Sequence, residues 1–424
     1  MRRLKTLISL LAPMATHRDL RNIAILNITL GMGMSLVSPF LSTFGTKEVG
    51  MSEAIYGLFM VVTTIAGVFW GTYLAQKSDR TLSRRTMTLL GGTMGAIGHI
   101  GYGFVRDVRG LLTIGVLILG VSGVTFSQLF AYAREQLQRS DLPQGTIPFY
   151  NNVFRMFFAL SWTIGPGVAP SFLERWDYEG LFLAGAGCYL LFTLIASRVV
   201  LDYPPAPADT KAPHVPFRKF LSRRDIAAHF LAFVLVSSAH TINFANLPLY
   251  IQDPADLAGN LSHVGNAMRI APFFELPFMI YFGVLATRYH PARIVRIGIG
   301  ILIPYYTGLW LVRVPWQVYP LQILIAAATA VTSGVAISYF QNHLPNQPGA
   351  ATNLYGNAMS IGRIVGYFGF AAIVGSWGHR NTYLATMLLI SFSLALMMIR
   401  SHDEKDIEEP GPVDVSPPFP VRGA

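Results

Sequence analysis

Long apolar runs, separated by short charged or Pro/Gly-rich breaks, dominate the chain. A helix needs about 20 residues to cross the hydrocarbon layer of a membrane, so each run of that length predicts a membrane-spanning helix. Twelve such runs occur, at residues 22–45, 53–76, 86–105, 110–133, 147–172, 180–201, 226–251, 264–287, 293–312, 316–342, 350–375 and 382–399. The pattern therefore predicts an all-α membrane protein with twelve transmembrane helices.

A proline-rich and basic segment at residues 202–225 separates the sixth run from the seventh. We therefore expect an N-terminal six-helix half at 22–201, a cytoplasmic linker at 202–225 and a C-terminal six-helix half at 226–400. Residues 1–21 are predicted to be a cytoplasmic segment on the membrane surface. A signal peptide is not favoured there, because the apolar stretch is short and ends at a proline. Residues 401–424, acidic and then proline-rich, are predicted to be a disordered cytoplasmic tail.

The two halves also resemble each other weakly in sequence. A shift of 208 residues aligns the second span and its following loop with the eighth, and a shift of 201 aligns the fifth span with the eleventh. The matched pairs are Gly57 with Gly265, Arg80 with Arg288, Arg85 with Arg293, Asn152 with Asn353 and Gly165 with Gly366. These matches indicate a duplicated half, as in transporters that are built from parallel repeats.

The distribution of charge predicts how the bundle is oriented. Of the 32 lysines and arginines, 23 fall in the termini, the linker and the loops on their side, six fall in the opposite loops and three fall within spans. Because basic residues concentrate on the cytoplasmic side of membrane proteins, both termini are predicted to lie inside. The net charge of +10 is therefore explained by topology, and no nucleic-acid partner is predicted.

Composition supports the membrane class and excludes several others. Hydrophobic residues make up 52% of the chain and charged residues only 13%, whereas a soluble domain typically carries about 25% charged residues. The single cysteine, Cys188, excludes an intrachain disulfide framework and a multi-cysteine metal site. The sequence has no Walker motif, no nucleophile–base pair and no metal-ligand spacing, so we predict neither an enzyme nor a cofactor.

Four charged side chains fall inside predicted spans: Arg155 in the fifth, Arg269 and Glu275 in the eighth, and Arg363 in the eleventh. An ionised residue at the bilayer centre costs at least about 2.5–3.5 kcal/mol, so each is a candidate functional residue. An apolar environment favours the neutral form of a carboxyl, so Glu275 could bind and release a proton as its exposure changes. The alternative is that Glu275 pairs with an intramembrane arginine and locks two helices together.

Uncharged polar residues and aromatic rings also occur within the spans. Amides donate and accept hydrogen bonds, and the faces of sugars pack on rings, so these residues are candidate ligands for a polyhydroxylated solute. They are Gln128, Asn243, Asn246, Asn353, Asn357, Trp162 and Tyr355. The alternative is hydrogen bonding between helices, which is common for asparagine and glutamine in membranes.

The loop between the second and third spans contains, in order, Gly71-Thr-Tyr-Leu-Ala-Gln-Lys-Ser-Asp79-Arg80-Thr-Leu-Ser-Arg84-Arg85. It resembles the loop signature of the major facilitator superfamily, in which an aspartate is followed by basic residues. The resemblance implies a major facilitator fold. It also makes Asp79, Arg80, Arg84 and Arg85 a candidate latch for one conformation, since Asp79 can pair with an arginine or lie at a helix N-terminus.

Several stretches are more specifically similar to the sugar efflux transporters of that superfamily. They are Leu129-Phe-Ala-Tyr-Ala-Arg134-Glu135, Phe154-Arg155, Trp162-Thr-Ile-Gly165-Pro166, Asn246-Leu-Pro248, Glu275-Leu-Pro277 and Tyr339-Phe-Gln341-Asn-His-Leu-Pro345. The resemblance covers nearly the whole chain. It implies a bacterial inner-membrane location and the export of sugars or sugar-like compounds against inward proton movement. It also makes Arg155, Asn246, Glu275 and Gln341 candidate cavity residues.

The chain departs from this family at a few positions. Leu82 replaces a loop glycine, and Val37 stands where the family often has a polar residue. The family's eleventh-helix arginine lies one turn earlier, where this chain has Ser360, and Arg269 has no counterpart. Since most of these positions lie on cavity-forming helices, the substrate stays open between a sugar and an apolar drug, as in multidrug exporters of the same superfamily.

We therefore expect a monomeric secondary active transporter with its solute site between two halves that rock around it. Glu275 would exchange protons, Arg155 and Arg363 would supply fixed positive charge, and Gln341 and the asparagines would hold hydroxyl groups. The predicted partners are a small sugar, protons and the lipid bilayer.

Overall fold

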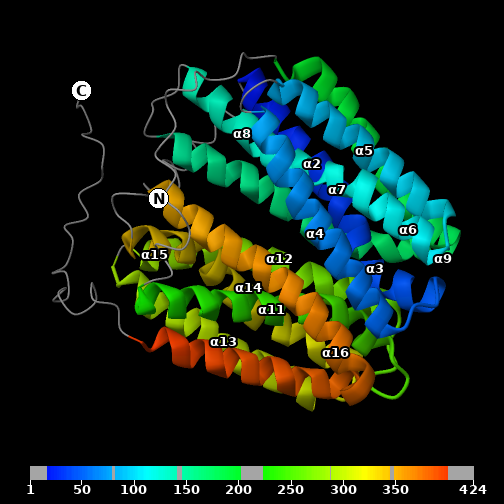
Figure 1. Cartoon of the computed structure of the whole chain (residues 1–424), viewed down its shortest axis with the longest axis vertical. Helices are drawn as coiled ribbons and strands as arrows, with labels where there is room; N and C mark the ends of the chain where they lie inside the picture. Colours follow the sequence, from blue (N-terminus) through cyan, green and yellow to red (C-terminus); the bar gives the residue numbers. More distant parts are fainter. Residues whose placement is uncertain are drawn as a thin grey trace, which may run out of the picture.

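The computed structural model describes residues 17–78, 82–140, 146–201, 223–286, 288–343 and 348–399. Within these ranges the chain is helical and contains no β-strand. Figure 1 shows the helices as two groups, one coloured blue to green and the other green to red, which lie side by side. The prediction of an all-α fold in two halves is therefore confirmed.

The first group runs from α2 to α9. Its first helix, α2 (Arg18–Val37), continues through η1 (Ser38–Phe40), α3 (Leu41–Thr43) and η2 (Phe44–Glu48). The regular helix is interrupted at Pro39, since proline has no N–H to donate to the preceding turn. The other elements are α4 (Glu53–Ser78), α5 (Arg84–Phe104), α6 (Val108–Ile114), η3 (Gly115–Leu119), α7 (Gly120–Ser122), α8 (Val124–Arg139) and α9 (Ile147–Val199).

The second group runs from α11 to α16 and repeats the plan of the first. Its elements are α11 (Arg224–Gln252), α12 (Leu261–Leu285), α13 (Pro291–Leu311), η6 (Pro315–Gln317), α14 (Val318–Ala330), η7 (Val331–Val335), α15 (Ala336–His343) and α16 (Pro348–Met397). Five-residue π-helical turns occur in the fourth and tenth predicted spans, as η3 and η7. Such turns are often found at functional sites in helices.

Nine helices in the described part of the chain are long and apolar enough to cross a membrane. Two of them, α9 and α16, exceed the length of one span, and each contains a break. Asp177 in α9 has a φ of 50°, and Gly378 in α16 has a φ of 74°. Both breaks fall in predicted loops, and α5 occupies the place of the third predicted span. Twelve spans, and the boundaries of the halves, stay predictions, since the linker and tail lie largely outside the described residues.

The contacts of the matched glycines support the internal repeat. Gly165 in α9 lies so close to α2 that a Cβ atom there would overlap the side chain of Ser35. Gly366 in α16 lies equally close to α11, because its Cβ would be 2.7 Å from the Ser238 carbonyl oxygen. Since these glycines are 201 residues apart, the pairs α2–α9 and α11–α16 occupy equivalent places in the two halves.

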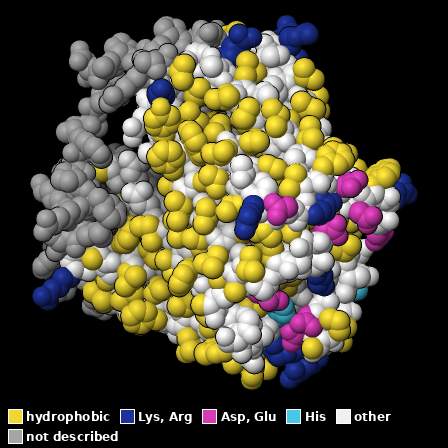
Figure 2. Space-filling view, turned by 45° about the vertical axis from the view of Figure 1, so that its right-hand side comes forward, with side chains coloured by type: hydrophobic (Ala, Val, Ile, Leu, Met, Phe, Trp, Pro, Cys, Tyr) yellow, Lys and Arg dark blue, Asp and Glu magenta, His cyan; other side chains and the backbone are white. Residues whose placement is uncertain are grey.

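An apolar surface surrounds the bundle. Figure 2 shows hydrophobic side chains over most of one face, with the acidic side chains gathered toward one side and basic side chains at several edges. Many large apolar side chains are exposed in the absence of lipid, including Phe69, Phe104, Leu194, Ile280 and Leu388. Such an extensive apolar surface fits contact with lipid rather than with water.

The two ends of the bundle are distinguished by their charged residues. We call the end that carries Lys47, Arg106 and Arg380 the Lys47 end, and the opposite end the Arg84 end. The helix α4 connects them, since its 26 residues extend for about 39 Å at 1.5 Å per residue.

The two halves are in close contact at the Lys47 end. A Cβ atom at Gly57 in α4 would lie 2.6 Å from the Cβ of Ala371 in α16, and one at Gly265 in α12 would overlap the Pro166 carbonyl in α9. Gly71 lies about four turns along α4 from Gly57, on nearly the same face, and a Cβ there would meet no atom of the described residues within 4 Å. We conclude that α4 and α16 touch near the Lys47 end and separate toward the Arg84 end.

Candidate functional site

Glu275 lies between polar groups of the second half. The Ser333 side chain, in the π-helical turn η7, lies beside its carboxyl and donates a hydrogen bond of 2.7 Å to the Thr329 carbonyl. The neighbouring residue of that turn, Thr332, accepts a hydrogen bond of 2.8 Å from the Tyr355 hydroxyl. The turn therefore connects α12 with α16, and it places Glu275 and Tyr355 close enough for their charges to interact.

Arg155 reaches the same region from the first half. It lies in α9 with an exposed side chain, and its guanidinium carbon is 5.9 Å from the centre of the Phe130 ring. The Tyr355 hydroxyl interacts electrostatically with both Arg155 and Glu275. Tyr355 therefore lies within electrostatic range of both oppositely charged side chains that the sequence singled out, one from each half.

No arginine among the described residues lies within the 4.0 Å ion-pair distance of Glu275. Arg269, six residues earlier in α12, instead lies against α9, where its Cδ and Nη1 atoms would be 3.0 Å from a Cβ at Gly167. The alternative of a locked Glu275–arginine pair is therefore not realised in this conformation.

Four further predicted residues, in α15 and α16, have side chains that are not fully buried. Asn353 and Asn357 are exposed on α16, as is Arg363, which interacts electrostatically with Tyr367. Gln341 in α15 donates a hydrogen bond of 3.0 Å to the Thr352 hydroxyl of α16. Accessible amides and a guanidinium on this helix leave hydrogen-bonding capacity for a solute.

Trp162 is half-buried and joins the halves by a ring contact. Its ring centre lies 6.2 Å from that of Phe244 in α11, at an interplanar angle of 58°. The tryptophan is therefore part of the contact between the halves as well as a surface on which a ring could pack.

The other predicted ligands are buried in contacts between helices. Gln128 accepts hydrogen bonds from Ser78 at 3.1 Å and from Arg84 at 3.4 Å. Asn243 accepts one of 3.3 Å from the hydroxyl of Tyr305. These geometries are the interhelical hydrogen bonds that the sequence left open as the alternative.

Asn246 is fully buried and also serves a helix contact. Its Nδ2 donates to the backbone oxygen of His379 at 2.9 Å, and its Oδ1 lies 2.7 Å from the Nδ1 of the same histidine. The amide therefore holds the break in α16 rather than facing the region of Glu275.

The candidate latch is described in part. Arg84 forms an ion pair with Glu135 in α8, and Arg85 donates a hydrogen bond of 2.8 Å to the Ser197 carbonyl in α9. These contacts connect α5 with α8 and α9 within the first half. Asp79 and Arg80 lie outside the described residues, so their part in a latch stays a prediction.

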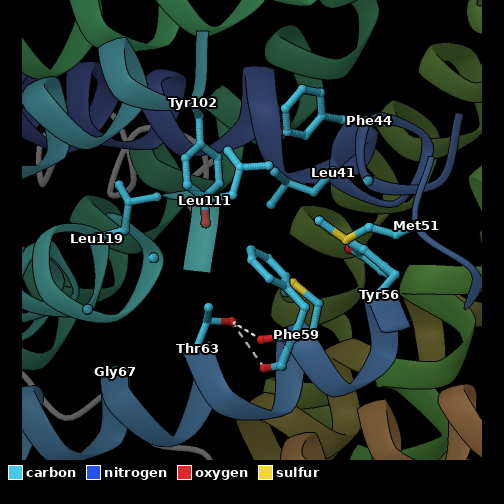
Figure 3. A pocket seen from close by; sticks show the side chains of 14 residues that line it. Leu41, Phe44, Met51, Tyr56, Phe59, Thr63, Gly67, Tyr102, Leu111 and Leu119 are labelled. Atoms are coloured by element: carbon cyan, nitrogen blue, oxygen red, sulfur yellow. Dashed lines mark hydrogen bonds between the residues drawn. The ribbon is translucent and has the colours of Figure 1, made fainter. Parts of the chain in front are cut away.

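A cavity of about 170 Å³ lies in the first half, at the Lys47 end (Figure 3). Its lining is mostly apolar, and its Thr63 hydroxyl is already bonded to the carbonyls of Phe59 and Met60. A second cavity of about 210 Å³ shares Leu41 and Tyr102 with the first. Both lie apart from Glu275, so we do not assign the predicted solute site to them.

Two residues that lie next to predicted site residues could not be predicted from any pattern in the sequence. Ser333 belongs to a segment that is 58 residues from Glu275, and His379 is 133 residues from Asn246. Only the packing of α12 against α14 and η7, and of α11 against α16, brings them together.

Comparison with known proteins identifies the family. The chain matches the model of the Major Facilitator Superfamily over residues 23–367. It is 31% identical to Sugar efflux transporter A of Dickeya chrysanthemi over 90% of this chain and 96% of that protein. It is 28% identical to Sugar efflux transporter A of Escherichia coli over 87% of this chain and 92% of that protein.

The fold is also that of solved transporters. The nucleoside transporter NupG superposes with a TM-score of 0.75 at 15% identity, covering 91% of this chain and 100% of that one. At that identity the likeness shows the fold, which confirms the predicted major facilitator architecture. The chain belongs to the sugar efflux transporter family of the major facilitator superfamily, whose members are multi-pass membrane transporters rather than enzymes.

Proposed function

We propose that this protein exports sugars or sugar-like small molecules across a bacterial plasma membrane by proton antiport. The names of its relatives support the substrate class. The bias of basic residues supports an orientation in which both termini and the Arg84 end are cytoplasmic and the Lys47 end faces outward. A monomer in the lipid bilayer is the proposed working unit.

The observation that carries the proposed site is that Tyr355 lies within electrostatic range of both Arg155 and Glu275. A solute between the halves can contact both halves only where their polar groups converge, and these three residues come from α9, α12 and α16. Accessible amides at Asn353 and Asn357 would hold hydroxyl groups. Arg155 would supply a fixed positive charge at the site.

Glu275 is the proposed proton carrier. In this conformation no arginine of the described residues lies at ion-pair distance from the carboxyl. A change in its surroundings between two conformations would therefore change its proton affinity. The carboxyl would take up a proton from outside and release it inside as the sugar leaves.

Alternating access is the proposed cycle. The present contacts at Gly57 and Gly265 close the Lys47 end. Rocking of one half against the other would break these contacts and close the Arg84 end instead, while the solute stays at the centre.

The test is efflux of a radiolabelled galactoside from preloaded vesicles, with and without a pH gradient. We expect the gradient to accelerate wild-type efflux and to have no effect on Glu275→Gln. A matched control is Glu179→Gln, because Glu179 is exposed in α9 at the Lys47 end, and it should behave as wild type. A Glu275→Gln variant that remains gradient-driven would refute the assignment of the proton site.

Drug export is the other outcome of this test. Relatives that are named multidrug resistance proteins are less similar to this chain than the sugar efflux transporters, so sugars are favoured. If the wild type moves no galactoside but expels apolar drugs, the proposed substrate class is wrong.

A further inference from the structure

We propose that the cavity of about 210 Å³ in the first half is a second solute subsite, in which His99 accepts a hydrogen bond from a hydroxyl group of the ligand. We call it the His99 cavity. Its ligand is a six-membered ring that carries hydroxyl groups, such as the second ring of a disaccharide. This inference rests on the proposed function, because it adds a second place for the same solute to the site near Glu275.

The His99 cavity lies among the helices of the first half. Its lining comes from α2, α5, α8 and α9 and from the short elements between them. It shares Leu41, Tyr102 and Leu119 with the neighbouring cavity, so Tyr102 forms part of the wall between the two (Figure 3). An apolar cavity of about 150 Å³ is enough to bind benzene, so the His99 cavity has room for one six-membered ring.

Polar groups are part of this lining. Beside the imidazole of His99 it contains five side chains with hydroxyl groups, those of Ser38, Tyr102, Ser122, Thr125 and Tyr189. Thr125 already donates a hydrogen bond of 2.7 Å to the Ser122 carbonyl. A cavity wall with several hydroxyl groups suits a ligand that both donates and accepts hydrogen bonds.

The imidazole of His99 has an unused hydrogen-bond acceptor. The side chain is only 8% exposed, and its Nδ1 lies 2.7 Å from the Gly95 carbonyl oxygen, one turn earlier in α5. A carbonyl only accepts hydrogen bonds, so Nδ1 carries the hydrogen, and Nε2 of the neutral ring is an acceptor. Nε2 has no hydrogen-bond partner among the described residues. Packing does not seal it off, in contrast to the Nε2 of His240, so it opens into the cavity.

Aromatic rings surround this acceptor. The centre of the Tyr189 ring lies 4.9 Å from that of His99, and the Phe182 ring lies 5.6 Å from the Tyr102 ring. Ligand pockets typically combine such apolar surfaces with a few polar groups that fix the orientation of the ligand. A buried acceptor without a partner costs free energy, so a ligand hydroxyl that donates to Nε2 makes a hydrogen bond that the protein itself lacks.

Phe126 connects the His99 cavity with the region of Arg155. Its side chain lines the cavity and is 43% exposed. Its ring centre lies 4.7 Å from that of Phe130, and the guanidinium carbon of Arg155 lies 5.9 Å from the Phe130 ring. Two adjacent rings therefore lead from the cavity to Arg155. We place the first ring of the solute beside Arg155 and the second against His99.

The first test is protection of a cysteine in the cavity. Ser38→Cys in a Cys188→Ser background would be alkylated with a small, uncharged thiol reagent, in purified protein in lipid nanodiscs. Lactose at ten times its dissociation constant should slow the alkylation about ten-fold, since only the unoccupied fraction of the protein reacts. Thr63→Cys is the matched control. Thr63 lines the neighbouring cavity and not this one, so lactose should leave its alkylation unchanged.

The second test removes the acceptor. In His99→Asn the amide nitrogen can take the place of Nδ1 and keep the bond to the Gly95 carbonyl, but no group takes the place of Nε2. The Michaelis constant for lactose efflux should rise about two- to ten-fold, the effect of one hydrogen bond, while that for galactose stays unchanged. His99→Gln, whose amide oxygen reaches the place of Nε2, should restore part of the affinity for lactose.

The subsite is refuted if lactose does not slow the alkylation of Ser38→Cys. It is also refuted if His99→Asn raises the Michaelis constants for lactose and galactose equally, since His99 would then act through the packing of the first half. Export of galactose without protection by lactose would refute the subsite and keep the proposed function. Protection by lactose without export of either sugar would refute the proposed function and keep the subsite.

Discussion

Adding one methyl group at Gly57 should open the Lys47 end of this protein. In the conformation described here, the new Cβ of Gly57→Ala would lie 2.6 Å from the Cβ of Ala371 and 2.8 Å from the backbone oxygen of Tyr367. Carbon atoms are in favourable contact at about 3.5–4.0 Å, so the overlap is close to 1 Å. Backbone atoms supply part of the obstacle, and a side-chain rotation cannot remove it.

The size of the effect follows from the cost of overpacking. Inserting a methylene into a filled contact costs about 1–3 kcal/mol. The cost applies to the conformation in which α4 and α16 touch, and it disappears once the halves separate there. The equilibrium should therefore move about 5- to 150-fold toward an open Lys47 end.

Spin labels at Arg109→Cys and Arg313→Cys would report the change as a longer distance between the halves. Gly67→Ala is the matched control, because Gly67 lies on the same helix and a Cβ there would meet nothing within 4 Å. We expect Gly67→Ala to match the unmodified protein. An unchanged distance distribution in Gly57→Ala, or an equal shift in both variants, would show that this contact does not close the Lys47 end.

Two further predictions concern helix packing within the halves. Gln128→Ala removes an acceptor that Arg84 uses at 3.4 Å. It should cost about 1 kcal/mol of stability and lower the melting temperature, while the Michaelis constant for sugar stays unchanged. A raised Michaelis constant at an unchanged melting temperature would instead indicate that Gln128 is a sugar ligand. Gly362→Ala would put a Cβ 2.6 Å from the Val234 carbonyl and should cost about 1–3 kcal/mol, whereas Gly356→Ala has nothing within 4 Å and should melt with the wild type.

Hydropathy predicted the fold because a membrane imposes a length and a polarity on each helix. The helix breaks at Asp177 and Gly378 fall in loops that the positions of charged residues and glycines had predicted. The repeat predicted equivalent places for Gly57 and Gly265, and both are close contacts between the halves. The π-helical turn η7 had no such signal, because it arises from packing among helices.

Charged residues and amides within the spans differ in how their surroundings relate to the predictions. An intramembrane charge is costly, so Arg155 and Glu275 are rare and informative, and the structure brings both near Tyr355. An uncharged amide costs less free energy to place within the membrane than a charge does, so it can join helices as well as bind a solute. Asn243 and Asn246 lie in such helix contacts. Their neighbours are far away in the sequence, so no local pattern could separate the two roles.

The coupling of sugar export to protons at Glu275 can be measured as proton movement that a sugar gradient drives. Purified protein in liposomes would be loaded with a galactoside and a pH-sensitive dye, then diluted into sugar-free buffer. We predict that the lumen acidifies as sugar leaves, and that Glu275→Gln lets sugar leave without acidification. Sugar efflux from the wild type with no change in the luminal pH would contradict the claim.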